Sequence, residues 1–425
     1  MNEVANRLPR RTILKGIAAG VAVTTLTRPA FGVPETVKIG LVGPKTGRLA
    51  LFYEEMSYAI DAAMAAMNNS ITINGTVHPL EIVVKDSQSS PNRASEVAQE
   101  LILKDKVHIV TAFATPETVN PVADQCELNG VPCVSNDAPL EPYFFGRKGN
   151  PKKGFEWTYH FFFSGPGAGE ATNKALVRVP TNKKMGVLWA NDIDGRTMSR
   201  VVPPTLSEAG LVLIDPGRFD LPASDFTPEI SAFKAAEAEI VYSVIPGPDF
   251  TVFWNQAAQQ GFKPKALVAG KVGEFPQAVY LYSQRATNFL TEVWWSKFHP
   301  FASGLTGQSS QELAKAYEKA SNQQASMGLG FRHSLIEVAV DALKRTQSLG
   351  DPSSIRDALR DTDYKSIVGP INFKKYAFPN VCETKLVMGQ WRKGAKWPVE
   401  IVIVDNTFLP EVSAQGVPEP IVYVG

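Results

Sequence analysis

The chain has 425 residues, with 43 Lys and Arg against 42 Asp and Glu, so its formal net charge is +1. A near-neutral chain has no basic surplus to neutralise many phosphates, which argues against a nucleic-acid partner. Its 44% hydrophobic and 20% charged residues are ordinary values for a globular protein. At roughly 150 residues per domain, the length predicts two to three domains.

The N-terminus has the composition of a removable export signal. Residues 8–15 read LPRRTILK, and the moderately apolar residues 16–27 follow. That stretch is shorter than the roughly 20 residues needed to span a bilayer. Ala30 and Gly32 are the small residues expected before a cleavage site. We therefore predict a twin-arginine signal peptide over residues 1–32, cleaved near Gly32, and a mature protein in the periplasm.

Apolar strands alternate with helices in the first half of the mature chain. The pattern predicts strands at residues 37–42, 80–86, 107–113 and 131–135, and helices at residues 48–68, 91–104 and 117–128. Ser90 can cap the helix that starts at Pro91, because proline fits a first helical turn. Strands that alternate with helices predict right-handed crossovers and a parallel sheet.

The same alternation restarts after residues 158–163. It predicts helices at residues 167–179, 195–208, 226–236 and 250–260, and strands at residues 184–190, 211–216, 239–246 and 266–270. Further on it predicts a strand at residues 289–295, helices at residues 308–319, 328–345 and 353–361, and β hairpins or edge strands at residues 364–375 and 383–404. The predicted fold class is α/β, with two doubly wound parallel-sheet lobes.

An ordered set of segments carries a family resemblance. The segments read VKIGLVGPKTG, KDSQSSPNRASEVAQELI, AFATPETVNPVADQ, GVPCVSNDAP, GFRHSLIEVAVDALKR and GPINF. Together, from about Val37 to Trp391, they resemble the substrate-binding proteins of branched-chain amino acid-type ABC transporters. The resemblance implies two lobes joined by three crossover strands, which close on a small-molecule ligand and then dock on a membrane permease.

The expected lobe boundaries follow from where the chain changes character. We expect lobe 1 to comprise residues 33–158 and 293–384, and lobe 2 to comprise residues 159–292 and 385–425. Because closure of such a cleft needs no second subunit, we expect a monomer. The same fold also serves sensors, so a receptor module that signals instead of transporting is the alternative function.

Ligands of open parallel sheets bind beyond the carboxyl ends of the strands, where the strand order reverses. The candidate ligand-binding residues are those in and next to the loops after the predicted strands: Phe52, Tyr53, Ala114, Thr115, Ser135, Asp137 and Ala138 in the first lobe, and Asp192, Asp194, Gly247 and Lys271 in the second. The N-terminus of the helix after Thr115 attracts an anion such as a carboxylate. The resemblance implies that this loop holds the ligand carboxylate and that the SNDAP segment contacts its amine.

Each of these assignments has a structural alternative. Thr115, and either Asp192 or Asp194, can simply cap the following helix, and Lys271 can be a solvated loop lysine. If Thr115 and Asp137 bind the ligand, their replacement by Ala should weaken binding with little loss of thermal stability. Aliphatic amino acids, amides and aromatic carboxylates all remain possible ligands.

The chain lacks the motifs of the main enzyme classes. Pro44 precedes Lys45 in GLVGPKTG, so the backbone N–H that a phosphate loop needs is missing, and neither GxGxxG after a strand nor GxSxG is present. His333, on an apolar helix, is interpreted as a core histidine. Cys126, Cys133 and Cys382 lack metal-ligand spacing, and a Cys126–Cys133 bridge is left open beside two free thiols. We predict a non-enzyme without metal or cofactor.

Overall fold

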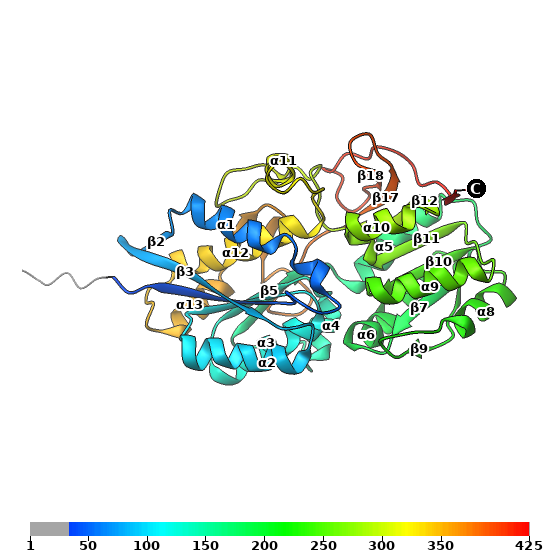
Figure 1. Cartoon of the computed structure of the whole chain (residues 1–425). Helices are drawn as coiled ribbons and strands as arrows, with labels where there is room; N and C mark the ends of the chain where they lie inside the picture. The colour runs from blue at the N-terminus through cyan, green and yellow to red at the C-terminus, as the bar shows by residue number, and fades with distance from the viewer. Residues whose placement is uncertain (1–33, 425) are drawn as a thin grey trace, which may run out of the picture. The chain divides into compact units, whose positions relative to one another are not determined.

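The computed structural model describes residues 34–424. From Glu35 onward the chain forms one compact unit, in which Figure 1 shows two α/β lobes side by side. The predicted signal peptide, residues 1–32, lies outside the described residues. No helix in the described part is long and apolar enough to cross a membrane.

The first lobe is built on a seven-stranded sheet with the order β16-β6-β5-β4-β1-β3-β2. Its strands are β1 (Val37–Gly43), β2 (Ser70–Ile73), β3 (Thr76–Asp86), β4 (Ile109–Phe113), β5 (Cys133–Asn136), β6 (Thr158–Phe162) and β16 (Val381–Glu383). All neighbours are parallel except β2 and β3, which form a hairpin. The buried apolar runs of β1 and β4 predict this arrangement, because central parallel strands are covered on both faces.

The second lobe is built on a larger, mixed sheet with the order β18-β17-β13-β11-β10-β7-β8. Its strands are β7 (Lys184–Ala190), β8 (Val212–Ile214), β9 (Arg218–Phe219, paired with β7), β10 (Ile240–Ile245), β11 (Ala266–Lys271), β13 (Phe289–Val293), β17 (Val387–Lys393) and β18 (Val399–Asp405). In this sheet β8, β7, β10, β11 and β13 run parallel to one another, whereas β17 and β18 form the antiparallel edge. Two short ladders, β12 (Ala286–Thr287) with β19 (Val422–Tyr423) and β14 (Asp363–Ser366) with β15 (Gly369–Asn372), complete the β structure.

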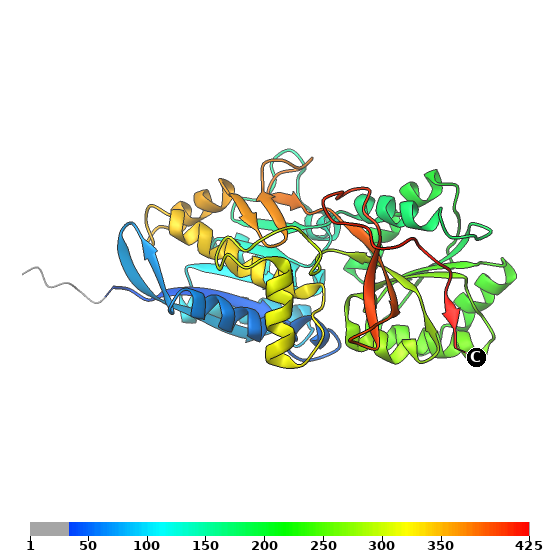
Figure 2. The same cartoon turned by 90° about the horizontal axis from the view of Figure 1, so that it is seen from above.

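Helices cover both faces of each sheet, as Figures 1 and 2 show. In the first lobe α1 packs with α12 and α2 packs with α3. The helices of this lobe are α1 (Met56–Ala66), α2 (Pro91–Glu100), α3 (Pro116–Asn129), α4 (Leu140–Gly146), α11 (Ser310–Ser321), α12 (Gly328–Arg345) and α13 (Pro352–Arg360). Those of the second lobe are α5 (Gly165–Leu176), α6 (Ile193–Val201), α7 (Pro203–Glu208), α8 (Thr227–Ala235), α9 (Gly247–Gln259) and α10 (Pro276–Ser283).

The chain passes between the two sheets three times. It leaves the first sheet after β6, returns after β13, and leaves again between β16 and β17. Since β6 pairs within the first sheet, the first passage follows Phe162 and not Thr158. Three crossings join the lobes through short segments, which is the architecture that the resemblance implies.

Several predicted elements differ from the observed ones. The helix expected over residues 48–68 is a short 3-10 turn, Ala50–Tyr53, followed by α1. The helix expected over residues 195–208 is divided into α6 and α7, because Pro203 has no N–H to continue the helix. The β2–β3 hairpin, α4 and α10 were not predicted at all. As predicted, Ser90 caps α2 by accepting a hydrogen bond from the Arg93 N–H at 3.4 Å.

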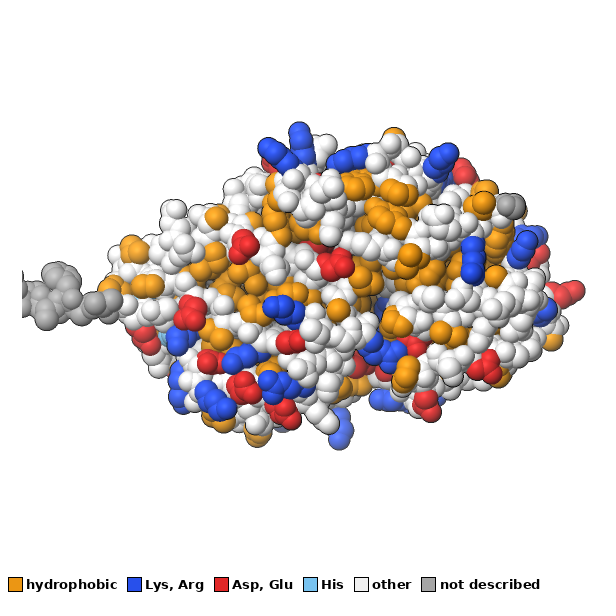
Figure 3. Space-filling model, in the orientation of Figure 1, with side chains coloured by type: hydrophobic (Ala, Val, Ile, Leu, Met, Phe, Trp, Pro, Cys, Tyr) orange, Lys and Arg blue, Asp and Glu red, His pale blue; other side chains and the backbone are white. Residues whose placement is uncertain are grey.

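The three cysteines form no disulfide, and the surface charge drawn in Figure 3 is mixed in sign. Cys126, Cys133 and Cys382 are buried free thiols, so the bridge left open above does not form. On the face drawn in Figure 3, basic and acidic side chains are interspersed over the first lobe. The charges that distinguish this protein are buried between the lobes, as described next.

Candidate functional site

The strand order reverses beside β1 and β4 in the first sheet and beside β7 and β10 in the second. Residues that follow these strands, together with the crossover segments, line one narrow cavity. Its walls are Phe52, Thr115, Asp137, Pro139, Phe162, Phe163, Asp194, Met198, Tyr242, Val244, Gly270, Lys271, Glu274, Glu292 and Trp294. Both lobes therefore contribute to one shared site, beyond the carboxyl ends of their strands.

In the first lobe, a buried ion pair forms part of the cavity wall. The Asp137 carboxylate accepts a hydrogen bond from the Arg332 guanidinium, and both side chains are almost completely buried. Arg332 also donates to the Phe52 carbonyl through Nε at 2.8 Å. Arg332 is therefore a structural support for both Phe52 and Asp137, which line the cavity. Phe52 reaches the other lobe, where its ring meets Phe275 edge to face at 4.8 Å.

In the second lobe, Lys271 lies among carboxylates. Its ammonium is 2.7 Å from Asp194 Oδ2 and 3.6 Å from Asp192 Oδ2. Burial alone would lower the pKa of Lys271, but Asp194, Asp192 and Glu117 raise it above its ordinary value. Lys271 is thus a charged, buried lysine and not a solvated one. Asp192 also caps α6, accepting from the Gly195 N–H at 2.6 Å, as one of the two alternatives predicted.

Two further acidic side chains line the same wall without a basic partner of their own. Glu274 and Glu292 are 6% and 5% exposed, and Tyr242 donates to Glu292 Oε1 at 3.1 Å. Burial raises the pKa of both carboxyl groups above the ordinary range, and the charge of Glu292 raises that of Glu274 further. Neither residue was predicted, because a Glu after or within a strand has no distinguishing sequence pattern.

Aromatic rings close the cavity at the crossover segments. Phe162, Phe163 and Trp294 belong to two different passages between the lobes, and the Phe162 and Trp294 rings are 4.7 Å apart, edge to face. Phe162 and Phe163 therefore stand where the chain first passes between the lobes. An apolar wall opposite buried charges is typical of small-molecule sites.

Five of the predicted residues, Phe52, Thr115, Asp137, Asp194 and Lys271, line the cavity. Asp192 and Gly247 line adjoining hollows instead. Tyr53 packs on Phe113 with ring centroids 5.9 Å apart, and Ala114 is fully buried. None of these four is among the residues that line the central cavity.

Ser135 and Ala138 have a structural role. The Ser135 hydroxyl is 2.8 Å from His160 Nδ1, and His160 Nε2 is 2.7 Å from the Ala138 carbonyl. Nε2 must carry the proton to donate to a carbonyl, so Nδ1 accepts from Ser135. Burial lowers the pKa of His160 to about 3. A neutral, fully buried histidine thus orients the segment that carries Asp137.

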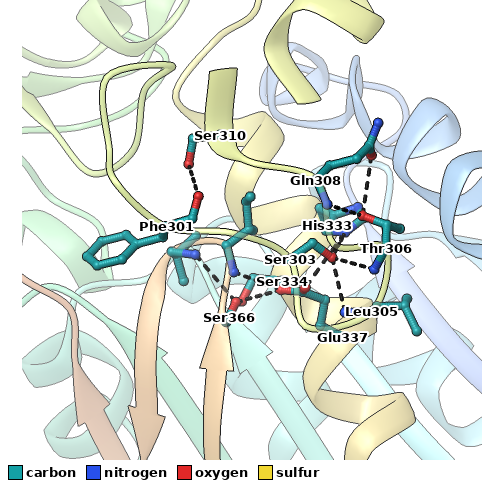
Figure 4. A network of polar contacts seen from close by, with 12 residues as sticks. Phe301, Ser303, Leu305, Thr306, Gln308, Ser310, His333, Ser334, Glu337 and Ser366 are labelled. Atoms are coloured by element: carbon teal, nitrogen blue, oxygen red, sulfur yellow. Dashed lines mark hydrogen bonds and ion pairs between the residues drawn. The ribbon is translucent and has the colours of Figure 1, made fainter. Parts of the chain in front are cut away.

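A second Ser–His contact, shown in Figure 4, involves a residue of α12 and could in principle belong to a hydrolase triad. Ser303 Oγ lies 2.9 Å from His333 Nε2, and Glu337 Oε1 lies 3.8 Å from the same nitrogen. In a catalytic triad the acid contacts the other ring nitrogen, whereas His333 Nδ1 has no partner. All three side chains are buried. The network anchors a loop to α12, as expected of a core histidine.

Among the described residues, no cluster of three or more His, Cys, Asp or Glu is arranged to hold a metal ion. The cavity lining presents buried charges, hydroxyl groups and aromatic rings.

Comparison with known proteins gives the family. A family model described as periplasmic binding protein matches residues 36–396. A Leu/Ile/Val-binding protein homolog 6 of Brucella melitensis is 24% identical over 370 residues, which cover 84% of this chain and 89% of the relative. Homologues and structural neighbours are binding proteins and not enzymes.

Solved structures share the fold. The leucine binding protein LivK of Thermotoga maritima has a TM-score of 0.73 at 19% identity, covering 87% of this chain and 99% of that one. A solute binding protein of an R. palustris ABC transporter, in complex with 4-hydroxybenzoate, has a TM-score of 0.70 at 17% identity, covering 87% and 96%. The chain belongs to the periplasmic binding protein family, and it shares the fold of these solved binding proteins.

Proposed function

We propose that the protein captures a small amino acid-like, amide or aromatic carboxylate solute between its lobes and delivers it to an ABC permease in the inner membrane. The observation that supports this proposal is the shared cavity, whose walls come from both lobes and from two of the three passages between them. A ligand that contacts both walls stabilises the closed arrangement, because only there are all contacts made.

The relatives are named for different ligands, so several ligand classes remain in the proposal. One relative is named for leucine, isoleucine and valine, and one structural neighbour holds 4-hydroxybenzoate. Phe52, Phe162 and Trp294 offer surface to an aliphatic or aromatic group. Thr115 and Asp194 offer polar contacts from opposite lobes.

The route and organisation proposed with this function follow the sequence. We propose export through a twin-arginine signal cleaved near Gly32, a monomeric mature protein, and lobes bounded near residues 162, 293 and 384. The family implies an extracytoplasmic location.

A thermal-shift screen of the mature protein, beginning at Val33, tests the function. Amino acids, amides and aromatic carboxylates are the panel, and a true ligand at 100 times its Kd should stabilise the protein by about 2.7 kcal/mol. Thr115→Ala should weaken that ligand by about threefold to tenfold, since it removes one hydroxyl contact. Thr407→Ala, at an exposed position, is the matched control.

Two outcomes contradict the proposal. If no compound of the three classes raises the melting temperature, the proposed ligand classes are wrong. If deletion of the gene leaves uptake of the identified ligand unchanged but abolishes a transcriptional response to it, the sensor alternative replaces transport.

A further inference from the structure

The cavity holds more acidic groups than basic ones. Asp137, Asp194, Glu274 and Glu292 line it, while Lys271 is the one basic residue among its lining residues. Lys271 is already paired with Asp194, and Arg332, behind the wall, is paired with Asp137. Glu274 and Glu292 are therefore in excess, and neither has a basic group to itself.

Glu274 is buried, and one oxygen of its carboxyl group is unpaired. It lies on the turn Val272–Glu274 that follows β11, it is 6% exposed, and its Oε2 atom has no hydrogen-bond partner. Glu292 stands on the neighbouring strand β13. Gly270 lies beside it, since a Cβ atom built there would be 3.5 Å from Glu292 Oε2.

A buried carboxylate without a counter-charge is costly, so it takes up a proton or binds a cation. The charged and titratable groups that face Glu274 are Glu292, Lys271 and Asp194, and Tyr242 faces Glu292. A metal ion does not fit, because the described residues contain no cluster of three suitable ligands. An organic cation remains.

The opposite wall also disfavours a purely anionic ligand. We expected the N-terminus of α3 to hold a carboxylate, but the first turn of α3 already carries the buried carboxyl group of Glu117. Pro116, at the first helical position, contributes no N–H. Tyr242 and Trp294 add aromatic surface against which an organic cation is favourable.

We propose that Glu274 and Glu292 form a subsite for the positively charged group of the ligand, an ammonium or guanidinium, and that the cleft selects solutes of net positive charge. This inference rests on the proposed function and narrows its substrate class. In the free protein a proton neutralises the pair, and the incoming cation displaces that proton to solvent. Binding then releases a proton, and affinity increases with pH.

Matched probe pairs test the charge preference. L-Lysine and L-norleucine differ in a terminal ammonium, and L-arginine and L-citrulline differ in a guanidinium. By calorimetry at pH 7.5, the charged member of at least one pair should bind at least about tenfold more tightly, a difference of about 1.4 kcal/mol. Its affinity should increase between about pH 5 and pH 8, by up to about tenfold per pH unit for one released proton.

Isosteric variants assign the effect to the two carboxyl groups. Glu274→Gln and Glu292→Gln should each reduce the charge preference at least about tenfold and remove the proton release. Proton release is read from calorimetry in buffers of different ionisation enthalpy. Glu411→Gln changes an exposed carboxyl group outside the cavity and should alter neither measurement. Circular dichroism and the melting temperature establish that each variant is folded.

The outcomes separate this inference from the proposed function. The cationic subsite is overturned if a neutral or anionic solute binds tightly and its affinity falls as pH rises. It is also overturned if that affinity is unchanged in Glu274→Gln. Both results leave solute capture intact. Equal binding of both members of each probe pair also overturns the cationic subsite. If nothing binds in this panel or the thermal-shift screen, the proposed function fails together with it.

Discussion

At the residue scale, buried charges are arranged as pairs that brace the cavity walls. Asp137 and Arg332 form one pair, and Lys271 with Asp194 forms another. Burying each pair costs the hydration free energy of two charges. That cost is compensated only if the two groups lie in a favourable geometry for attraction and hydrogen bonding. The Arg332 guanidinium also lies over the Phe113 ring, 4.7 Å from its centroid. Such pairs are stable while intact and costly when one partner is lost.

Asp137→Ala should therefore destabilise the protein strongly. The substitution leaves the Arg332 guanidinium buried without its carboxylate, which costs about 3–5 kcal/mol. This corrects the expectation from the sequence that Asp137→Ala would spare thermal stability. Chemical denaturation of the ligand-free protein measures the loss.

A double variant is the control for that prediction. Asp137→Ala combined with Arg332→Met removes both charges, and it should lose less stability than Asp137→Ala alone. An Asp137→Ala protein as stable as the wild type would contradict the assignment of this ion pair as a structural brace.

At the element scale, contacts between elements of the two lobes hold the cleft closed. Arg48, in the loop after β1, pairs with Asp249 in the first turn of α9. Gln277 in α10 donates to Glu54 of the first lobe at 2.7 Å. α4 packs against α6 across the same boundary. These contacts stabilise only the closed arrangement.

Arg48→Ala should shift the equilibrium toward the open lobes. We expect ligand affinity to fall by about fivefold to thirtyfold, mainly through faster dissociation, since about 1–2 kcal/mol of closed-state contact is lost. Stopped-flow measurement of dissociation checks this. Arg285→Ala, at an exposed position in the second lobe, should leave the rate unchanged. A normal dissociation rate in Arg48→Ala would show that the ion pair does not stabilise closure.

Some missed elements had a signal in the sequence and others did not. Asn74-Gly75 is a strong hairpin dipeptide, and both residues have positive φ, 48° and 79°, so the β2–β3 hairpin was predictable. Pro203 likewise signalled the break between α6 and α7. α4 has seven residues, too few for a helical period to be recognised against the aromatic residues around it.

At the scale of the whole molecule, two lobes joined by three short passages can move as rigid bodies about those passages. The site is complete only when the lobes are together, because Phe52 and Asp137 come from one and Lys271 and Glu274 from the other. Under the proposed function, ligand binding and lobe closure are therefore coupled.

Small-angle X-ray scattering should detect this coupling. Saturating ligand should lower the radius of gyration of the mature protein. In the ligand-free state, Arg48→Ala should have a larger radius than the wild type, and Arg285→Ala should match the wild type. A radius that does not respond to ligand would mean that the cleft fills without lobe movement.

The sequence by itself determined the α/β alternation, the two-lobed class and the loops that meet at the site. These depend on local periodicity and on the rule that parallel strands place their carboxyl ends at one edge. Only the tertiary structure decided which side chains of those loops face the cavity. It also decided which of them instead pair with Arg332, hydrogen-bond to His160 or cap a helix. It decided as well that Glu274 and Glu292 line the same cavity. Partners distant in sequence set the charge balance of a buried site, and no local pattern encodes them.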